Sequence, residues 1–340
     1  MNAHDEAPRL IGESPPFLAL MEAVSRLAPL DRPVLVIGER GTGKELIAGR
    51  LHYLSRRWQG PFVTVNCAAL AESLLESELF GHEAGAFTGA QRRRIGRFEL
   101  AHGGTLFLDE VANASAVVQE KCLRAIEYGA FERVGGNETV RVDVRVVCAT
   151  NLDLPAEAAA GRFRRDLLDR LAFDVVTVPP LRSRGDDIAL LAEHFRRAMA
   201  RELGRGEGPR FADRALAALS AHPWPGNVRE LKNVVERAVY RAEPEGLIAD
   251  LVFDPFASPY RPRPAADEPA PVAKAEPAAL PADLDAAVAA FERRILIAAL
   301  AAHRHNHRAT ARALRLRYDQ LRARLRRHGL TRRSANGDRS

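Results

Sequence analysis

The sequence of 340 residues has only three cysteines, and their positions suit neither cross-linking nor metal binding. Cys67, Cys122 and Cys148 are far apart, odd in number and without a Cys-x-x-Cys pair. This pattern argues against a disulfide framework and against a zinc site. We expect all three to be small buried hydrophobic residues.

Long apolar runs are also lacking. No stretch approaches the roughly 18 apolar residues of a spanning helix, and the N-terminus has neither the basic nor the apolar region of a signal peptide. The sequence therefore predicts no membrane span and no secretion signal, and we expect a cytoplasmic protein. With 46% hydrophobic and 28% charged residues, the composition is that of a soluble globular protein with two or three domains.

Lysine is scarce, since 46 of the 50 basic residues are arginine. The only lysines are Lys44, Lys121, Lys232 and Lys274. The formal charge is +6, but residues 301–340 carry +10 and residues 1–300 carry −4. A basic terminal block on a mildly acidic body suggests one nucleic-acid-binding module appended to something else.

Short β-branched runs alternate with helical patterns in the body of the chain. The expected strands are 34–37, 62–65, 105–108, 144–147 and 173–176. The helical patterns between them include 44–54 and 115–128, which predicts an α/β fold with a parallel sheet and helices on both faces. Further helical patterns at about 187–203, 213–221 and 227–240 predict a small helical subdomain after the sheet.

A glycine-rich loop follows the first expected strand and precedes an apolar helix. Its residues are Gly38, Glu39, Arg40, Gly41, Thr42, Gly43, Lys44 and Glu45. Strand, glycine-rich turn and helix N-terminus form the setting of a phosphate-binding loop, in which backbone N–H groups of residues 40–45 would hold the phosphates of ATP. Lys44 would contact the β and γ oxygens, where arginine is no substitute. Glu45 stands where Ser or Thr would bind Mg²⁺, so metal binding must rest more on other groups and water.

Two acids end the third expected strand. At the carboxyl edge of a sheet, Asp109 can hold Mg²⁺ and Glu110 can polarise the attacking water. The alternative is that the two acids form a surface turn without a catalytic role, but the phosphate loop upstream favours an active site. A site that only binds nucleotide has no obvious need for Glu110. ATP hydrolysis is therefore favoured over simple nucleotide binding.

The uncharged hexapeptide at 85–90 has the wrong composition for a core helix. It consists of Gly85, Ala86, Phe87, Thr88, Gly89 and Ala90. Two glycines beside one aromatic and one hydroxyl indicate a mobile loop tip that contacts a partner. The segment resembles the bacterial enhancer-binding proteins, the AAA+ ATPases that activate sigma-54 RNA polymerase, for which GAFTGA is the signature. The resemblance covers residues 10–254 and resumes at about 283–330.

This resemblance implies roles for further residues. Loop 85–90 would contact sigma-54, and Asn66 would hydrogen-bond Glu110 and relay the γ-phosphate state to that loop. Thr150 and Asn151 match the first sensor and Arg229 the second, while residues 131–140 match a second pore-side hairpin.

The resemblance also implies a ring, by analogy a hexamer. Arg164 and Arg170 match the arginine fingers that reach into a neighbouring subunit's site. Six residues correspond to about 240° around a helix, so the two would not share one helical face, and only one of them need contact the phosphate.

The basic tail shows helical spacing at 284–300 and 309–314, followed by a turn and a third helix. This predicts a helix-turn-helix similar to the Fis-type DNA-binding domain, although Arg315 replaces the glycine usual in its turn. A solvated arginine-rich helix is the alternative. The DNA bases would be contacted by Arg317, Gln320 and Arg324, and the DNA phosphates would be contacted by Arg326 and Arg327.

The predicted domains are an AAA+ core, a helical lid, a Pro/Ala-rich linker, the DNA-binding domain and a disordered tail. Their bounds are 1–180, 181–254, 255–282, 283–330 and 331–340.

Control is expected in trans, because about ten residues precede the first expected helix and leave no room for a sensing domain. The resemblance implies a trans-acting inhibitory protein of the phage shock system that docks near Trp58, although simple packing at a loop base also explains that residue. Two other functions stay open: an AAA+ remodeller of another protein or of DNA, such as a helicase loader, and a DNA-binding regulator that senses ATP without contacting sigma-54.

Overall fold

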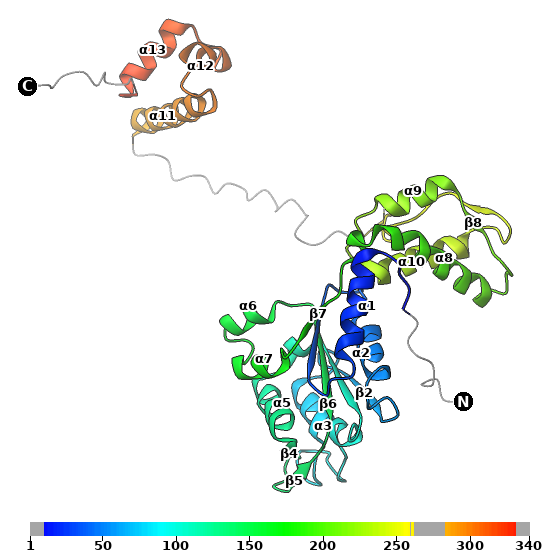
Figure 1. The fold of residues 1–340 in the computed structure, drawn as a ribbon. Coiled ribbons are helices and arrows are strands. Elements are labelled where there is room, and N and C mark those ends of the chain that lie inside the picture. The colour runs from blue at the N-terminus through cyan, green and yellow to red at the C-terminus, as the bar shows by residue number, and fades with distance from the viewer. Residues whose placement is uncertain (1–9, 259, 262–282, 331–340) are drawn as a thin grey trace, which may run out of the picture. The chain divides into compact units, whose positions relative to one another are not determined.

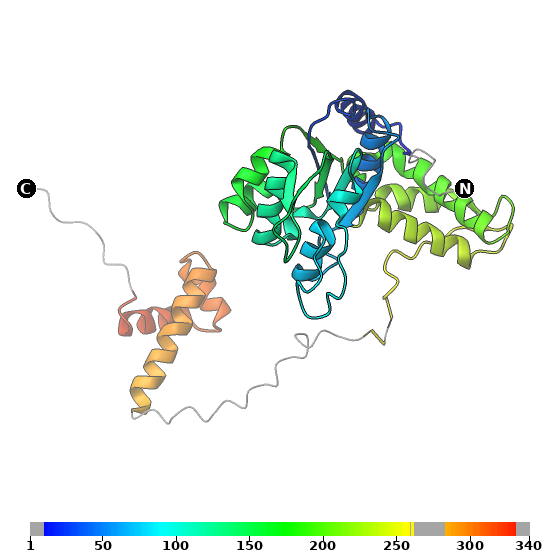
Figure 2. The ribbon, with the colours of Figure 1, turned by 90° about the horizontal axis from the view of Figure 1, so that it is seen from below.

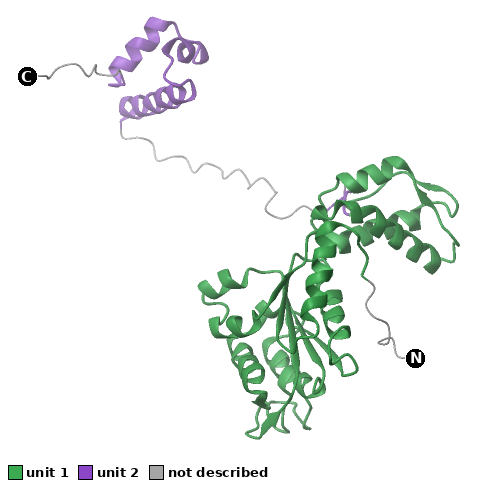
Figure 3. Cartoon of the chain, viewed as in Figure 1, with its two compact units in different colours: residues 1–255 green, residues 256–340 purple. Residues whose placement is uncertain are grey.

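The computed structural model describes residues 10–258, 260–261 and 283–330. The chain divides into two compact units, residues 1–255 and 256–340 (Figure 3). Most of the predicted linker and all of the predicted tail at 331–340 lie outside the described residues.

A parallel five-stranded sheet with the order β2-β3-β6-β1-β7 organises the first unit (Figure 1). Its strands are β1 (Val34–Ile37), β2 (Phe62–Asn66), β3 (Thr105–Asp109), β6 (Arg145–Thr150) and β7 (Val175–Thr177). All five strands predicted from the sequence are confirmed, and so is their parallel pairing. The sheet therefore brings the carboxyl ends of β1, β2, β3 and β6 to one edge.

Helices cover both faces of this sheet because successive strand residues point to opposite sides. Val34 and Val36 pack with α1 and α2, whereas Leu35 between them packs with α3, α5 and α7. These helices are α1 (Pro15–Leu27), α2 (Lys44–Tyr53), α3 (Glu72–Phe80), α5 (Ala116–Tyr128) and α7 (Arg165–Leu171). Near-continuous apolar strands such as β3 and β6, buried on both faces, are typical of this architecture.

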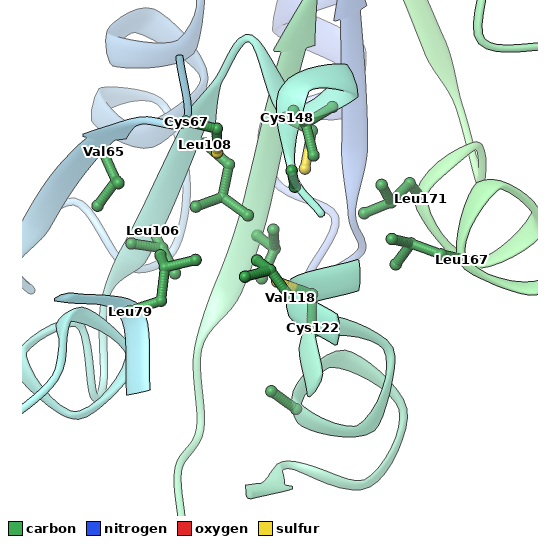
Figure 4. Packing of buried hydrophobic residues seen from close by; sticks show 14 of the residues in the cluster. Val65, Cys67, Leu79, Leu106, Leu108, Val118, Cys122, Cys148, Leu167 and Leu171 are labelled. Atoms are coloured by element: carbon green, nitrogen blue, oxygen red, sulfur yellow. The ribbon is translucent and has the colours of Figure 1, made fainter. Parts of the chain in front are cut away.

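The three cysteines lie in one of these two cores, as predicted. Figure 4 shows Cys67, Cys122 and Cys148 among apolar side chains that include Leu106 and Leu108. Burial raises the pKa of the Cys67 thiol to about 12 and raises the pKa of the other two as well. All three therefore remain neutral thiols that act as small core residues.

Shorter elements complete the α/β domain. They are α4 (Arg97–Leu100), η1 (Val111–Asn113), β4 (Ala130–Glu132), β5 (Thr139–Arg141) and α6 (Leu154–Ala159). Strands β4 and β5 pair antiparallel, which confirms the hairpin predicted over 131–140.

A helical subdomain follows the sheet, as predicted. It contains η2 (Leu181–Ser183), α8 (Gly185–Glu202), β8 (Arg210–Phe211), α9 (Asp213–Ala221), α10 (Asn227–Arg241) and β9 (Leu247–Ile248). The three helices lie beside one another, next to the α/β domain (Figure 2). Their common core is built around Trp224, which is fully buried. We call this subdomain the lid.

The second unit contains three helices around a small apolar core. They are α11 (Leu284–Ala302), α12 (His307–Ala313) and α13 (Tyr318–Arg327). Arg315, in the turn between α12 and α13, has φ +54°, the left-handed conformation that glycine would adopt with less strain. The turn therefore keeps its shape despite the arginine, and the predicted helix-turn-helix is confirmed. No helix among the described residues is long and apolar enough to cross a membrane.

Candidate nucleotide site and DNA-binding helices

The glycine-rich loop lies between β1 and α2 at the carboxyl edge of the sheet. Gly41 and Gly43 have φ +77° and +91°, which favour glycine. The Lys44 ammonium folds back over the loop and donates to the carbonyl oxygens of Gly38 at 2.9 Å and Glu39 at 3.2 Å. Burial lowers the pKa of Lys44, an effect that the nearby carboxylates of Glu110 and Asp109 oppose. The loop thus has the strand, turn and helix N-terminus of a phosphate site.

The two predicted acids stand at the end of β3, beside this loop. Asn66 donates from Nδ2 to Asp109 Oδ2 at 3.1 Å. The predicted hydrogen bond from Asn66 to Glu110 was therefore wrong for this structure. The strand register explains the difference, because Asn66 lies directly opposite Asp109, while Glu110 leaves the strand with a left-handed φ of +53°.

The predicted first sensor lies at the end of β6, the neighbouring strand. The Thr150 hydroxyl is fully buried and accepts from the Leu152 backbone N–H at 3.0 Å, so it is turned into the structure. When the Asn151 amide is assigned with its nitrogen toward Glu110, the orientation that satisfies both of its polar atoms, it donates to Glu110 Oε2 and accepts from Arg40 Nε at 3.3 Å. Of the two predicted sensor residues, Asn151 is therefore the one that touches the predicted catalytic glutamate.

The lid meets the phosphate loop at the start of α10, which carries the predicted second sensor. The Arg229 backbone N–H donates to the Gly41 carbonyl at 3.3 Å, while its side chain is exposed. A Cβ on Gly41 would lie 2.3 Å from the Gly226 carbonyl oxygen, so only glycine permits this close approach.

A polar cluster that was not predicted from the sequence lies at the same junction. Arg182 pairs with both carboxylate oxygens of Glu39 at 2.6 and 2.8 Å, and Asn227 donates to the same carboxylate at 3.0 Å. These two partners lower the pKa of Glu39 to about 2, with the Arg182 hydrogen bonds as the larger cause. The only signal in the sequence was the acid within the loop, and no local pattern indicates its partners 143 and 188 residues away.

The predicted arginine fingers both lie against α5. Arg164 precedes α7 as its N-cap residue, and it pairs with Asp166 at 2.7 Å and with Glu120 at 3.7 Å. Arg170, in the last turn of α7, pairs with Glu127 of α5. The expectation that the two arginines diverge by about 240° was wrong, because Arg164 lies outside the helix and both side chains meet the same face of α5.

Loop 85–90 closes on itself. The Gly85 N–H donates to the Ala90 carbonyl at 2.7 Å, and the Ala90 N–H donates to Phe87 at 2.9 Å. Gly85 and Gly89 have φ +83° and +101°. Phe87 is 43% exposed and its ring packs edge-on against His82 at 5.0 Å.

A buried arginine ties the base of this loop to its surroundings. Arg133, at the hairpin, pairs with Glu83 at 3.1 Å and with Glu99 at 2.6 Å while its side chain is only 4% exposed. The hairpin and the base of loop 85–90 are therefore held together by ion pairs, which were not predicted from the sequence.

The residues at α13 that were predicted to contact DNA differ from one another in their contacts within the structure. The Gln320 side chain accepts from the Arg317 N–H at 3.0 Å and so caps the helix. Arg324 pairs with Glu292 of α11, which also accepts from His328 at 3.0 Å. Arg324 is therefore turned toward α11, and its predicted orientation toward bases was wrong for this structure. Arg326 and Arg327 are exposed, as phosphate contacts require.

A parallel sheet with a phosphate loop, an acidic pair at the adjacent strand end and a helical lid defines an AAA+ P-loop ATPase, here with a Fis-type helix-turn-helix unit. Residues 10–177 match the Sigma-54 interaction domain family, residues 182–262 the AAA+ ATPase lid domain and residues 287–328 the Fis family of bacterial regulatory proteins. The chain belongs to the sigma-54-dependent transcriptional activators. It is accordingly an ATPase and a DNA-binding activator.

Individual relatives agree with this assignment. The chain is 56% identical over 320 residues to the Psp operon transcriptional activator of Escherichia coli (strain K12), covering 94% of this chain and 97% of that protein. It is 46% identical to the C4-dicarboxylate transport transcriptional regulatory protein DctD of Pseudomonas aeruginosa, covering 96% of this chain but 66% of that protein. Among solved structures, NtrX from Brucella abortus in complex with ADP aligns with a TM-score of 0.68 and 35% identity, covering 94% of this chain and 70% of NtrX, and NtrX in complex with ATP also scores 0.68.

Proposed function

We propose that the protein hydrolyses ATP as a ring and uses the energy to press its 85–90 loops against sigma-54, remodelling the closed promoter complex at phage-shock promoters. The observation that carries this proposal is the combination, in one α/β domain, of Lys44 and Glu110 with a loop at 85–90 that closes on itself and exposes Phe87 and Thr88. The 56% identity to the Psp operon activator supports the phage-shock assignment.

Hydrolysis would divide among the residues at the sheet edge. The loop N–H groups and Lys44 bind the phosphates, and Glu110 takes a proton from the attacking water. Asn151 holds the Glu110 carboxylate, and Asn66 holds that of Asp109. Asp109 offers the oxygen donors that Mg²⁺ prefers, whereas Glu45 is exposed on the first turn of α2. Bound there, Mg²⁺ would neutralise charge that develops on the phosphate oxygens.

The predicted arginine fingers would complete the nucleotide site of a neighbouring subunit. Arg164 and Arg170 would exchange their intrachain carboxylates for the γ-phosphate of a neighbouring subunit, and the implied ring is a hexamer. These ion pairs are exposed, so releasing them costs little.

Arg164→Ala is expected to lower kcat for hydrolysis by about 10³-fold with ATP affinity changed less than about threefold, since a finger acts mainly on transition-state charge. Steady-state hydrolysis and binding of a fluorescent ATP analogue separate the two effects. Arg165→Ala, the exposed neighbour, is the matched control. Loss of ATP binding in a variant that still assembles would argue against the finger role.

Loop 85–90 would contact sigma-54 through Phe87 and Thr88, its exposed aromatic and hydroxyl. A pull-down of sigma-54 in ADP with aluminium fluoride tests this contact. We expect capture by the natural sequence and at least about a tenfold loss with Thr88→Ala, because a centrally placed contact dominates a small interface. Hydrolysis without capture, or capture unaffected by Thr88→Ala, would instead favour a remodeller of another target.

The inhibitory partner of the phage shock system would dock at Trp58, which is 55% exposed and packs only loosely against the Tyr53 ring at 6.5 Å. An exposed aromatic of this size is typical of a protein contact.

Upstream DNA would bind the second unit through Arg317, Arg326 and Arg327. Arg326→Ala is expected to weaken binding similarly for specific and non-specific duplexes and to reduce the slope of log K against log salt by about 1, because one phosphate contact is lost. Fluorescence anisotropy at several salt concentrations measures both. An unchanged slope would show that Arg326 does not contact a phosphate.

A further inference from the structure

Asn227, the first residue of α10, makes polar contacts that the apolar packing of the lid core does not require. It is fully buried and has a left-handed φ of +53°, a conformation that costs free energy in any residue but glycine. Its side chain makes three hydrogen bonds, and all of them leave α10. Oδ1 accepts from the Leu181 N–H at 2.8 Å, while Nδ2 donates to Glu39 Oε2 and to the Arg40 carbonyl, both at 3.0 Å.

These bonds connect three parts of the chain at one point. Leu181 belongs to η2, the first element of the lid after the sheet, and Glu39 and Arg40 belong to the phosphate loop. Both hydrogens of the Asn227 amide nitrogen are donated to the phosphate loop, and the amide oxygen accepts from η2. No other neutral side chain of this size offers two donors and an acceptor in that arrangement.

Arg229 stands two residues further along α10. Its backbone N–H already contacts the loop at Gly41, yet that single bond of 3.3 Å is long. Fixing Asn227 fixes the first turn of α10, and therefore the origin of the Arg229 side chain, relative to the loop that binds the phosphates.

We propose that Asn227 is a positioning residue for ATP hydrolysis: its amide ties the start of the lid helix to the phosphate loop and thereby sets where Arg229 meets the nucleotide. The inference rests on the proposed sensor role of Arg229 and adds to it the group that fixes its position. Asn227 itself need not touch ATP.

Two variants of Asn227 separate its amide from its backbone. Asn227→Asp keeps the acceptor for Leu181 but loses both donors and brings a carboxylate against Glu39. Asn227→Gly keeps the left-handed backbone without strain and removes the side chain, so it remains informative if the aspartate variant does not fold. Arg214→Ala removes an exposed ion pair with Asp250 elsewhere on the lid and is the matched control.

The test measures kcat and KM for ATP in the full chain, alone and in the Arg229→Ala background. We expect each Asn227 variant to lower kcat/KM by about 10-fold to 100-fold, with Arg214→Ala unchanged. In the Arg229→Ala background, the same variants should lower kcat/KM further by less than about twofold, because they act through the missing side chain. A purely structural role would lower the melting temperature and leave the kinetics of the folded protein unchanged.

Two outcomes overturn the proposal in distinguishable ways. If Arg229→Ala and Asn227→Gly each lower kcat/KM and their effects multiply in the double variant, Asn227 acts independently of Arg229, and only the positioning inference fails. If Arg229→Ala alone changes neither kcat nor KM, the sensor role fails, and the positioning inference fails with it.

Discussion

Glu110→Gln is expected to lower kcat for ATP hydrolysis by about 10³-fold while ATP still binds. The substitution keeps the size of the side chain and its ability to accept from Asn151, but it removes the carboxylate that we propose takes a proton from water. The substitution leaves Lys44 and the loop, the groups proposed to bind the phosphates, unchanged. Steady-state hydrolysis gives kcat, and titration with a fluorescent ATP analogue gives the affinity.

The control for this variant is Glu22→Gln, which removes an exposed carboxylate of α1 that pairs with Arg26 in the adjacent turn. It should hydrolyse ATP at the natural rate. A Glu110→Gln protein that retains more than about a tenth of the natural kcat would show that another group accepts the proton.

Arg145→Ala is expected to lower the free energy of unfolding of the first unit by about 3 kcal/mol. The Arg145 guanidinium is 3% exposed at the start of β6, and it donates to the carbonyls of Leu27, Ala28, Arg32 and Leu51. Two of these carbonyls end α1, and one lies in the last turn of α2. Removing the side chain leaves buried helix-end acceptors without partners and opens a cavity between helices and sheet.

Urea unfolding followed by tryptophan fluorescence measures this loss, since both tryptophans, Trp58 and Trp224, lie in the first unit. Arg26→Ala is the matched control, because its ion pair with Glu22 is exposed and should contribute no more than about 0.5 kcal/mol. If the two variants unfold at the same urea concentration, the buried guanidinium does not hold the helix ends.

Local patterns were sufficient to predict the strands, the lid helices and the helix-turn-helix. Apolar runs such as 34–37 report burial on both faces, and Gly-x4-Gly-Lys identifies a phosphate loop without knowledge of the rest of the chain. Lys44 and Glu110 could therefore be assigned roles before their surroundings were known.

The contacts that arrange the site could not be predicted in this way, because they join residues far apart in the sequence. The pairing of Asn66 with Asp109 depends on strand register, and the pairing of Arg324 with Glu292 depends on how α11 packs against α13. Asn227 lies 188 residues from Glu39, its partner in the loop. Among 46 arginines, moreover, no local pattern distinguishes the buried Arg145 from exposed ones.

We propose that ATP hydrolysis at the sheet edge drives remodelling of the sigma-54 complex through loop 85–90. The most direct test of this proposal is open-complex formation at a sigma-54 promoter with purified polymerase, detected as heparin-resistant promoter DNA. We expect open complexes with the natural protein and ATP, and none with ADP, with Glu110→Gln or with Thr88→Ala. Open complexes that form with Glu110→Gln as readily as with the natural protein, or none with a natural protein that hydrolyses ATP, would contradict it.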